Sequence, residues 1–109
     1  YDPYFLDYIG ENPYIITVHD MIHEKFPQYV TDANITIGHK KKVITRANRI
    51  IAISENTKKD IIEIFNINPQ KIDVIYHSTS MKHFSGKHKL QIPERFLLFV
   101  GDRTPYKNF

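Results

Sequence analysis

The hydrophobic pattern alternates short apolar runs with longer segments of mixed polarity. The apolar runs are rich in β-branched or aromatic residues and span residues 14–19, 49–53, 72–76 and 96–100. Such runs, bounded by turn-forming residues, are typical of buried strands. The segments 34–48 and 54–66 between them carry apolar positions at helical spacing. The sequence therefore predicts an α/β fold, a Rossmann-like parallel sheet covered by helices on both faces.

Individual residues set the expected faces and ends of the two helices. The residues expected to face the core are Ile37, Val43, Ile44 and Ala47 in the first helix and Ile61, Ile62 and Phe65 in the second. Ser54 is a good N-cap for the second helix, and Asn66 a good left-handed stop. Residues 21–32 show no clear period and contain Pro27, which predicts a loop with about one turn of helix.

Length and composition limit what the chain can be. It has 109 residues, a formal net charge of +3 and no cysteine. The charge favours anionic partners, while the missing cysteines exclude disulfides and thiolate metal sites and fit a reducing compartment. No apolar run is long enough to span a membrane, and residues 1–10 lack the features of a signal peptide. A sheet of three strands is too narrow for a stable doubly wound domain, so we expect a piece of a longer protein.

The segment "HKKKVITRANR", residues 39–49, is strongly basic. Lys42, Arg46 and Arg49 follow one another at helical spacing, opposite the expected apolar face. Such a face could meet nucleic acid or an anionic membrane, or could be an ordinary solvated surface. The segment lacks the interleaved aromatic residues typical of single-strand binding.

The segment "VHDMIHE" brings together His19, Asp20, His23 and Glu24. These residue types suit zinc or iron, but His19 ends a strand, so His23 cannot lie one helical turn above it. We therefore expect no metal site. The carboxyl end of a parallel strand is where open α/β sheets bind ligands, and an imidazole there can donate a hydrogen bond or carry a proton. A strand-end histidine bonded to the neighbouring backbone is the alternative.

Two further places could bind phosphate. Ser54 stands at a helix N-terminus, where free N–H groups can take a phosphate or a sugar hydroxyl, although helix capping explains the residue equally well. In "LLFVGDRTPYKNF", Gly101 permits a tight exit from a strand, and Arg103 and Lys107 follow in a loop with Pro105. Cations in that position could neutralise a diphosphate leaving group, or be two ordinary surface charges.

Taken in order, "ITVHDMIHEKFP", "KKKVITRANRIIAISENTKKDIIEIFNINPQKIDVIYH" and "FLLFVGDRTPYKNF" resemble the retaining glycosyltransferases of family 4. The resemblance implies a partial GT-B fold, in which two Rossmann-like domains face each other across a cleft. Residues 1–92 would be the latter half of the N-terminal, acceptor-side domain. Residues 93–109 would be the first strand and loop of the C-terminal, donor-binding domain.

The resemblance also assigns roles. His19 matches the histidine that such enzymes place beside the transferred sugar. Gly101, Arg103 and Lys107 fall in the loop that these enzymes turn toward the donor diphosphate, although many members carry the arginine directly after the glycine, where this chain has Asp102. A second departure is "HSTS", residues 77–80, in place of the family's Asn-Gly-hydrophobic-Asp.

The function implied is transfer of a sugar from a nucleotide-sugar donor to a glycan or lipid-linked acceptor in bacterial surface polysaccharide synthesis. Configuration at the anomeric carbon would be retained without a metal or other cofactor. The expected location is cytoplasmic, with peripheral association at the anionic inner face of the membrane, and no nucleic acid partner. Residues 1–109 alone are expected to be inactive. The alternative is a non-catalytic α/β binding module that uses the basic helix on nucleic acid or membrane.

Overall fold

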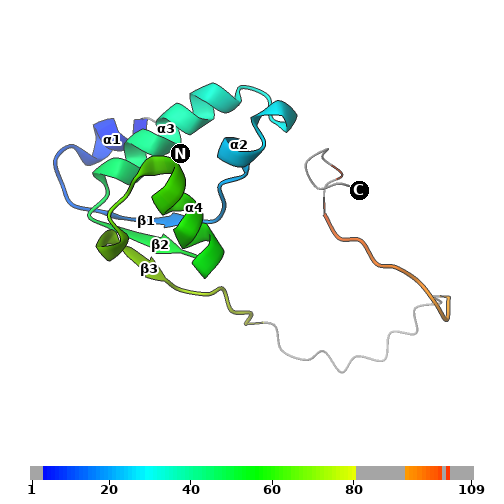
Figure 1. Ribbon diagram of the computed structural model, residues 1–109. Helices are drawn as coiled ribbons and strands as arrows, with labels where there is room; N and C mark the ends of the chain where they lie inside the picture. The colour runs from blue at the N-terminus through cyan, green and yellow to red at the C-terminus, as the bar shows by residue number, and fades with distance from the viewer. Residues whose placement is uncertain (1–3, 81–92, 102, 104–109) are drawn as a thin grey trace. The chain divides into compact units, whose positions relative to one another are not determined.

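The computed structural model describes residues 4–80, 93–101 and 103. The chain divides into two compact units, Tyr1–His77 and Ser78–Phe109, and each is described by itself. Within these described residues, every helix and strand belongs to the first unit (Figure 1). They are α1 (Tyr4–Ile9), β1 (Ile15–Val18), α2 (Ile22–Lys25), η1 (Pro27–Tyr29), α3 (Ala33–Arg46), β2 (Arg49–Ala52), α4 (Glu55–Phe65), η2 (Pro69–Lys71) and β3 (Ile72–Val74).

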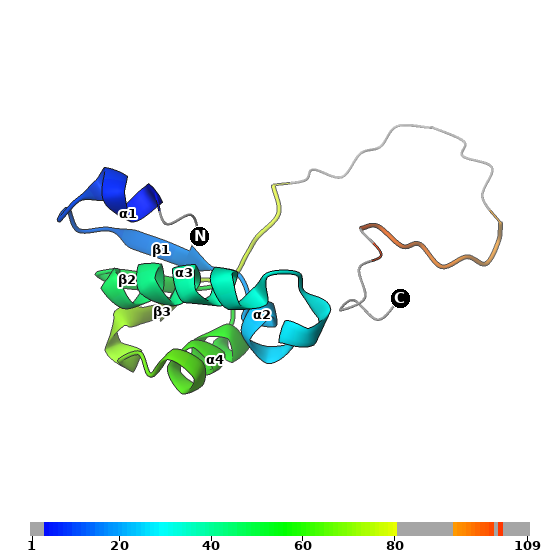
Figure 2. The same ribbon diagram turned by 90° about the horizontal axis from the view of Figure 1, so that it is seen from above.

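The strands form one parallel sheet with the order β1-β2-β3. Ile16, Ile50 and Ile72 lie side by side across it. The helices α3 and α4 connect successive strands and lie on the same face of the sheet (Figures 1 and 2). This arrangement is what two right-handed crossovers in one direction produce. The predicted α/β fold with a Rossmann-like parallel sheet is confirmed.

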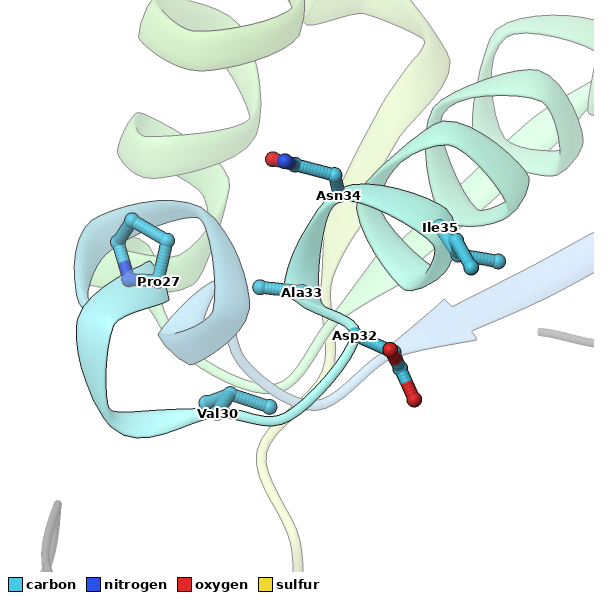
Figure 3. Close-up of a pocket in the computed structure, with 6 residues that line it drawn as sticks. All are labelled: Pro27, Val30, Asp32, Ala33, Asn34 and Ile35. Carbon is cyan, nitrogen blue, oxygen red and sulfur yellow. The ribbon is translucent and has the colours of Figure 1, made fainter.

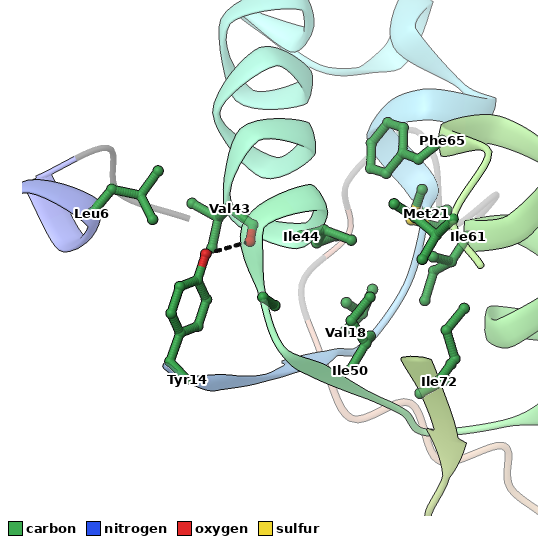
Figure 4. Packing of buried hydrophobic residues seen from close by; sticks show 13 residues of the cluster. Leu6, Tyr14, Val18, Met21, Val43, Ile44, Ile50, Ile61, Phe65 and Ile72 are labelled. Atoms are coloured by element: carbon green, nitrogen blue, oxygen red, sulfur yellow. Dashed lines mark hydrogen bonds between the residues drawn. The ribbon is translucent and has the colours of Figure 1, made fainter. Parts of the chain in front are cut away.

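The core lies between this face of the sheet and the two helices. Val18, Ile50 and Ile72 point from the strands toward α3 and α4, as Figure 4 shows. Among the predicted helical core residues, Val43, Ile44, Ala47, Ile61 and Phe65 are buried, while Ile37 and Ile62 are partly buried and pack against the cluster. Burial of each large aliphatic side chain contributes about 1.5–3 kcal/mol, so this cluster supplies most of the hydrophobic stabilisation of the unit.

The opposite face of the sheet is more open. Ile15 and Ile75, which point to that face, have 62% and 54% of their surface exposed. In residues 4–80 no helix covers it, so the second helical layer expected from the sequence is not found in the described part of the chain.

The expected ends of α4 are confirmed. Ser54 Oγ accepts a hydrogen bond from the backbone N–H of Thr57 at 3.1 Å, which is the geometry of an N-cap. Asn66 ends the helix in the left-handed region with φ of 54°, where asparagine is tolerated better than most residues. The segment 21–32 contains the short α2 and η1, as the mixture of polar residues with Pro27 predicted.

The three cations predicted to share one helical face do not do so. Lys42 is exposed on α3, but the Arg46 guanidinium lies 5.9 Å from the centre of the Tyr14 ring. Arg49 belongs to β2, not to the helix, and its guanidinium donates to Asp73 Oδ1 at 2.6 Å on the open face of the sheet. The helix ends at Arg46 because the next residues turn into β2, so the helical spacing does not continue to Arg49.

The prediction of a strand at residues 96–100 is wrong for the described structure. These residues form no strand, and Leu97 and Val100 are almost fully exposed. A strand requires a neighbouring backbone for its N–H and C=O groups. Within residues 93–101 no second strand is present to pair with this apolar run.

Tyr14 joins the start of β1 to the end of α3. Its hydroxyl donates to the Val43 carbonyl at 2.6 Å, and its backbone N–H donates to Asn48 Oδ1 at 3.1 Å. Burial raises the pKa of the Tyr14 hydroxyl above 10.0, and the nearby Arg46 charge lowers that pKa in part. The neutral phenol is therefore the form that the folded structure favours.

We expect Tyr14→Phe to lower the free energy of unfolding by about 1 kcal/mol at neutral pH, because the hydrogen bond from the Tyr14 hydroxyl to the Val43 carbonyl is lost, while the Ala47 N–H still donates to that carbonyl. The contribution of a group whose pKa is raised on folding is complete below its unfolded pKa and is lost as pH rises through the folded pKa. The difference between wild type and variant should therefore shrink above about pH 10. Urea unfolding measures both effects. Tyr8→Phe is the control because Tyr8 is 92% exposed, and equal stability of the two variants would contradict the prediction.

Candidate functional site

Three polar side chains come together at the carboxyl edge of the parallel sheet. His19 directly follows β1, Ser54 caps the helix that follows β2, and His77 lies three residues after the end of β3. Parallel strands all end at the same edge, so these residues lie at one edge of the sheet although they are far apart in the sequence. His19 was predicted to stand at the carboxyl end of its strand, and the structure places it there, with an exposed side chain.

The two histidine side chains contact each other. His19 Nδ1 and His77 Nε2 are 3.2 Å apart, within hydrogen-bond distance. The rings stack with centres 5.3 Å apart and an angle of 19° between their planes. His77 was not predicted as a site residue, because it belongs to the segment that departs from the family pattern. Its position at the end of a strand in the same sheet was the signal that could have identified it.

The backbone around His19 is held by three hydrogen bonds. The His19 carbonyl accepts from Thr57 Oγ1 at 3.5 Å, a long contact. The next residue is held more firmly, because the Asp20 carbonyl accepts from Lys40 Nζ at 2.6 Å and Asp20 Oδ1 accepts from the Ile22 N–H at 3.1 Å. These contacts tie the loop after β1 to α3 and α4, so the position of His19 depends on both helices.

Lys40 also forms a buried ion pair. Its Nζ lies 3.1 Å from Glu24 Oε2, and each side chain is only 1% exposed. The other carboxylate oxygen, Glu24 Oε1, is buried without a hydrogen-bond partner. Lys40 is therefore unlike Lys41 and Lys42, the exposed lysines that follow it in the basic segment. It is an internal cation that links α3 to α2 and to the loop bearing His19.

Ser54 is engaged in capping. Its Oγ accepts from the Thr57 N–H and lies 3.0 Å from Thr57 Oγ1. The side chain therefore has little remaining capacity for a ligand. Contact of Ser54 with a phosphate or an acceptor stays a prediction.

Residues 5–81 match the sequence model described as Glycosyltransferase Family 4. The chain belongs to this family. A similar curated protein is the O-antigen chain mannosyltransferase RfbU of Salmonella typhimurium strain LT2, with 29% identity over 93 residues. That alignment covers 85% of this chain, but the chain spans only 26% of the relative. No solved structure matches the chain significantly.

Two of the three residues predicted to bind the donor diphosphate, Gly101 and Arg103, lie in the part of the chain that the structure describes. Gly101 has φ of 146°, a backbone conformation that favours glycine, and Arg103 is exposed. Both belong to the second unit. Lys107 lies outside the described residues. Roles for these residues at the donor diphosphate therefore stay predictions, as does the domain boundary expected at residue 92.

The two acidic residues near His19, Asp20 and Glu24, are already engaged within the family 4 chain. Glu24 pairs with Lys40 in the interior, and Asp20 Oδ1 caps the turn into α2. Across the described residues, no group of three or more histidine, aspartate, glutamate or cysteine side chains is arranged to hold a metal ion.

A hollow of about 440 Å³ lies at the corner where η1 meets the start of α3. Its lining residues are Pro27, Val30, Asp32, Ala33, Asn34 and Ile35 (Figure 3). The lining includes one carboxylate and no cation, so it does not suit a diphosphate. Within the described part of the family 4 chain, no helix is long and apolar enough to cross a membrane.

Proposed function

We propose that the protein to which this chain belongs is a retaining glycosyltransferase. It transfers a sugar from a nucleotide-sugar donor to a glycan or lipid-linked acceptor. Family membership supports glycosyl transfer, and the similarity to an O-antigen chain mannosyltransferase supports a role in bacterial surface polysaccharide synthesis. The structural observation that carries the proposal is His19, exposed at the carboxyl edge of the sheet and held by contacts from α3 and α4.

In this proposal His19 faces the transferred sugar, and Arg103 and Lys107 bind the donor diphosphate. As the glycosidic bond breaks, negative charge gathers on the diphosphate. Fixed cations stabilise that charge more strongly in the transition state than in the ground state. No metal is required for this step if the two cations supply the positive charge. The enzyme would work in the cytoplasm, at the inner face of the membrane when the acceptor is lipid-linked.

The test is a transfer assay on the intact enzyme with a panel of nucleotide-sugars that includes a mannosyl donor. We expect one donor to give a product whose anomeric configuration, measured by NMR, equals that of the donor. Transfer should persist in EDTA. An inverted product would overturn the retaining mechanism, and no transfer from any nucleotide-sugar would overturn the proposed activity.

Lys107→Ala is expected to lower kcat about 10–100-fold, with a smaller change in the KM for the donor. A hydrogen bond to a charged group is worth about 1.5–3 kcal/mol, and here it strengthens as the leaving group departs. We expect a smaller loss for Arg103→Ala, because Asp102 stands where many relatives carry the arginine. Steady-state kinetics with varied donor measure both. Wild-type kcat and KM in Lys107→Ala would remove Lys107 from the mechanism.

A further inference from the structure

The contact between the two imidazoles restricts where their protons can be. His19 Nδ1 and His77 Nε2 are 3.2 Å apart. A hydrogen bond at this distance needs an N–H on one nitrogen and a lone pair on the other. The state of His77 therefore determines which nitrogen of a neutral His19 carries the proton.

Either ring could be the donor in this hydrogen bond. Only the arrangement with His77 as donor lets both rings keep their more common neutral tautomer. A neutral imidazole side chain in water prefers the tautomer with its proton on Nε2. If both rings adopt it, His77 Nε2–H donates to the lone pair of His19 Nδ1, and His19 Nε2 keeps its own proton. We propose that His77 is a positioning residue that fixes His19 as a hydrogen-bond donor at Nε2. This inference rests on the proposed function, because it specifies how His19 meets the sugar.

Both histidines follow segments whose backbones are held in place. The sheet pairing continues beyond β3, since the Ile75 N–H donates to the Ala52 carbonyl at 2.9 Å, two residues before His77. On the other side, Lys40 Nζ binds the Asp20 carbonyl at 2.6 Å, one residue after His19. The stacked rings, with an angle of 19° between their planes, restrict each other further. The pair therefore combines anchored backbones with a specific ring orientation.

A fixed N–H at Nε2 has a defined chemical use. It can donate to an oxygen of the bound sugar, either a hydroxyl or an oxygen that gains charge during transfer. It cannot accept a proton there without first losing its own. Second residues that fix the tautomer of a functional histidine in this way are common at metal and catalytic sites. The pair thus assigns His19 the role of donor and not of general base.

The first test is the tautomer of His19 in the intact enzyme labelled with ¹⁵N-histidine, by NMR at about pH 8, where imidazoles are mostly neutral. We expect His19 to be protonated at Nε2 in wild type. His77→Gln should preserve this state, because its amide N–H can still donate to Nδ1. His77→Glu should reverse it, because a carboxylate can only accept. A wild-type His19 protonated at Nδ1, or a tautomer unchanged in both His77→Glu and His77→Ala, would overturn the proposal.

The second test is kinetic. The net value of one hydrogen bond corresponds to about a 3–10-fold loss in kcat/KM for His77→Ala. His77→Gln should recover most of it, and His77→Glu should be worse than alanine. Tyr76→Ala is the control, since Tyr76 is a neighbouring side chain with 67% of its surface exposed. Equal activity of the Gln, Glu and Ala variants would overturn the positioning role. The NMR result does not depend on turnover. Absence of transferase activity would therefore overturn the proposed function, while the tautomer of His19 would still test whether His77 donates to it.

Discussion

Lys40→Met is expected to lower the free energy of unfolding by about 3–5 kcal/mol, the range found when one partner of a buried ion pair is removed. The neighbouring Lys41→Met and Lys42→Met should change it by less than about 0.5 kcal/mol, because both side chains are exposed. The three variants share the same chemistry in adjacent positions of α3. Urea unfolding at neutral pH measures the difference. If Lys40→Met lowers the free energy of unfolding no more than Lys41→Met and Lys42→Met do, the ion pair does not stabilise the fold.

The large expected loss of stability follows from the groups that lose their partner when Lys40 is replaced. Glu24 would remain 1% exposed with no cation beside it, and its Oε1 already lacks a hydrogen-bond partner. An unpaired carboxylate in that environment must be protonated or must draw water into the core. The Asp20 carbonyl would also lose its 2.6 Å donor. The loop that carries His19 should therefore loosen in the same variant.

A second change separates loss of the pair from loss of packing. In Lys40→Met/Glu24→Met both charges are replaced by apolar side chains of suitable length. Replacement of a whole buried pair is often neutral or stabilising, so we expect much of the lost stability to return. Additive losses in the double variant would instead show that each side chain contributes through separate contacts.

The sequence pattern located α3, α4 and the three strands of the sheet well, because the burial of these elements follows regular periods. Val43 and Ile44, or Ile61 and Phe65, fall on one side of a helix wherever its exact ends lie. The same helical period could also have placed the Lys40 side chain on the buried face of α3. Lys40 lies three residues after Ile37 and four before Ile44, so the helical period places it on the apolar face. Its charge alone gives no sign of burial, because lysine is almost never fully buried unless it is paired.

The partner of Lys40 could not have been predicted in this way. Glu24 lies in a short helix within a segment that shows no period, so the sequence gives no face for its side chain. The contact of His19 with His77 could not have been predicted from the sequence pattern either. The parallel order β1-β2-β3 brings the ends of the outer strands to one edge, but ring stacking across the central strand depends on side-chain rotamers.

The apolar run at residues 96–100 shows a different limit. Its composition favours a strand, but β-propensity describes fit to a half-buried pleated surface and does not supply the neighbouring strand. No partner strand occurs in residues 93–101, and Leu97 is fully exposed there. The pattern alone therefore identified an apolar run, and not the segment against which it would pack.

His19→Ala is expected to lower the kcat of sugar transfer about 10²–10³-fold in the intact enzyme, with a smaller change in the KM for the donor. This is the loss found when one preorganised hydrogen-bond donor to developing charge is removed. The exposed ring at the sheet edge, anchored through Asp20 and Thr57, is such a preorganised donor in our proposal. Steady-state kinetics with varied donor separate the two parameters.

Two further variants, His19→Gln and His23→Ala, test whether the loss of kcat in His19→Ala comes from hydrogen-bond donation by His19. The glutamine amide can place an N–H close to the position of the imidazole Nε2, so His19→Gln should retain more activity than His19→Ala by about tenfold if donation at Nε2 is the role. His23 lies on α2, half-buried, and its removal should leave kcat within about threefold of wild type. If His19→Gln is as inactive as His19→Ala, proton transfer by the imidazole replaces donation as the mechanism. If His19→Ala retains wild-type kcat, His19 is not a catalytic residue, since no substrate contact that strengthens in the transition state would have been lost.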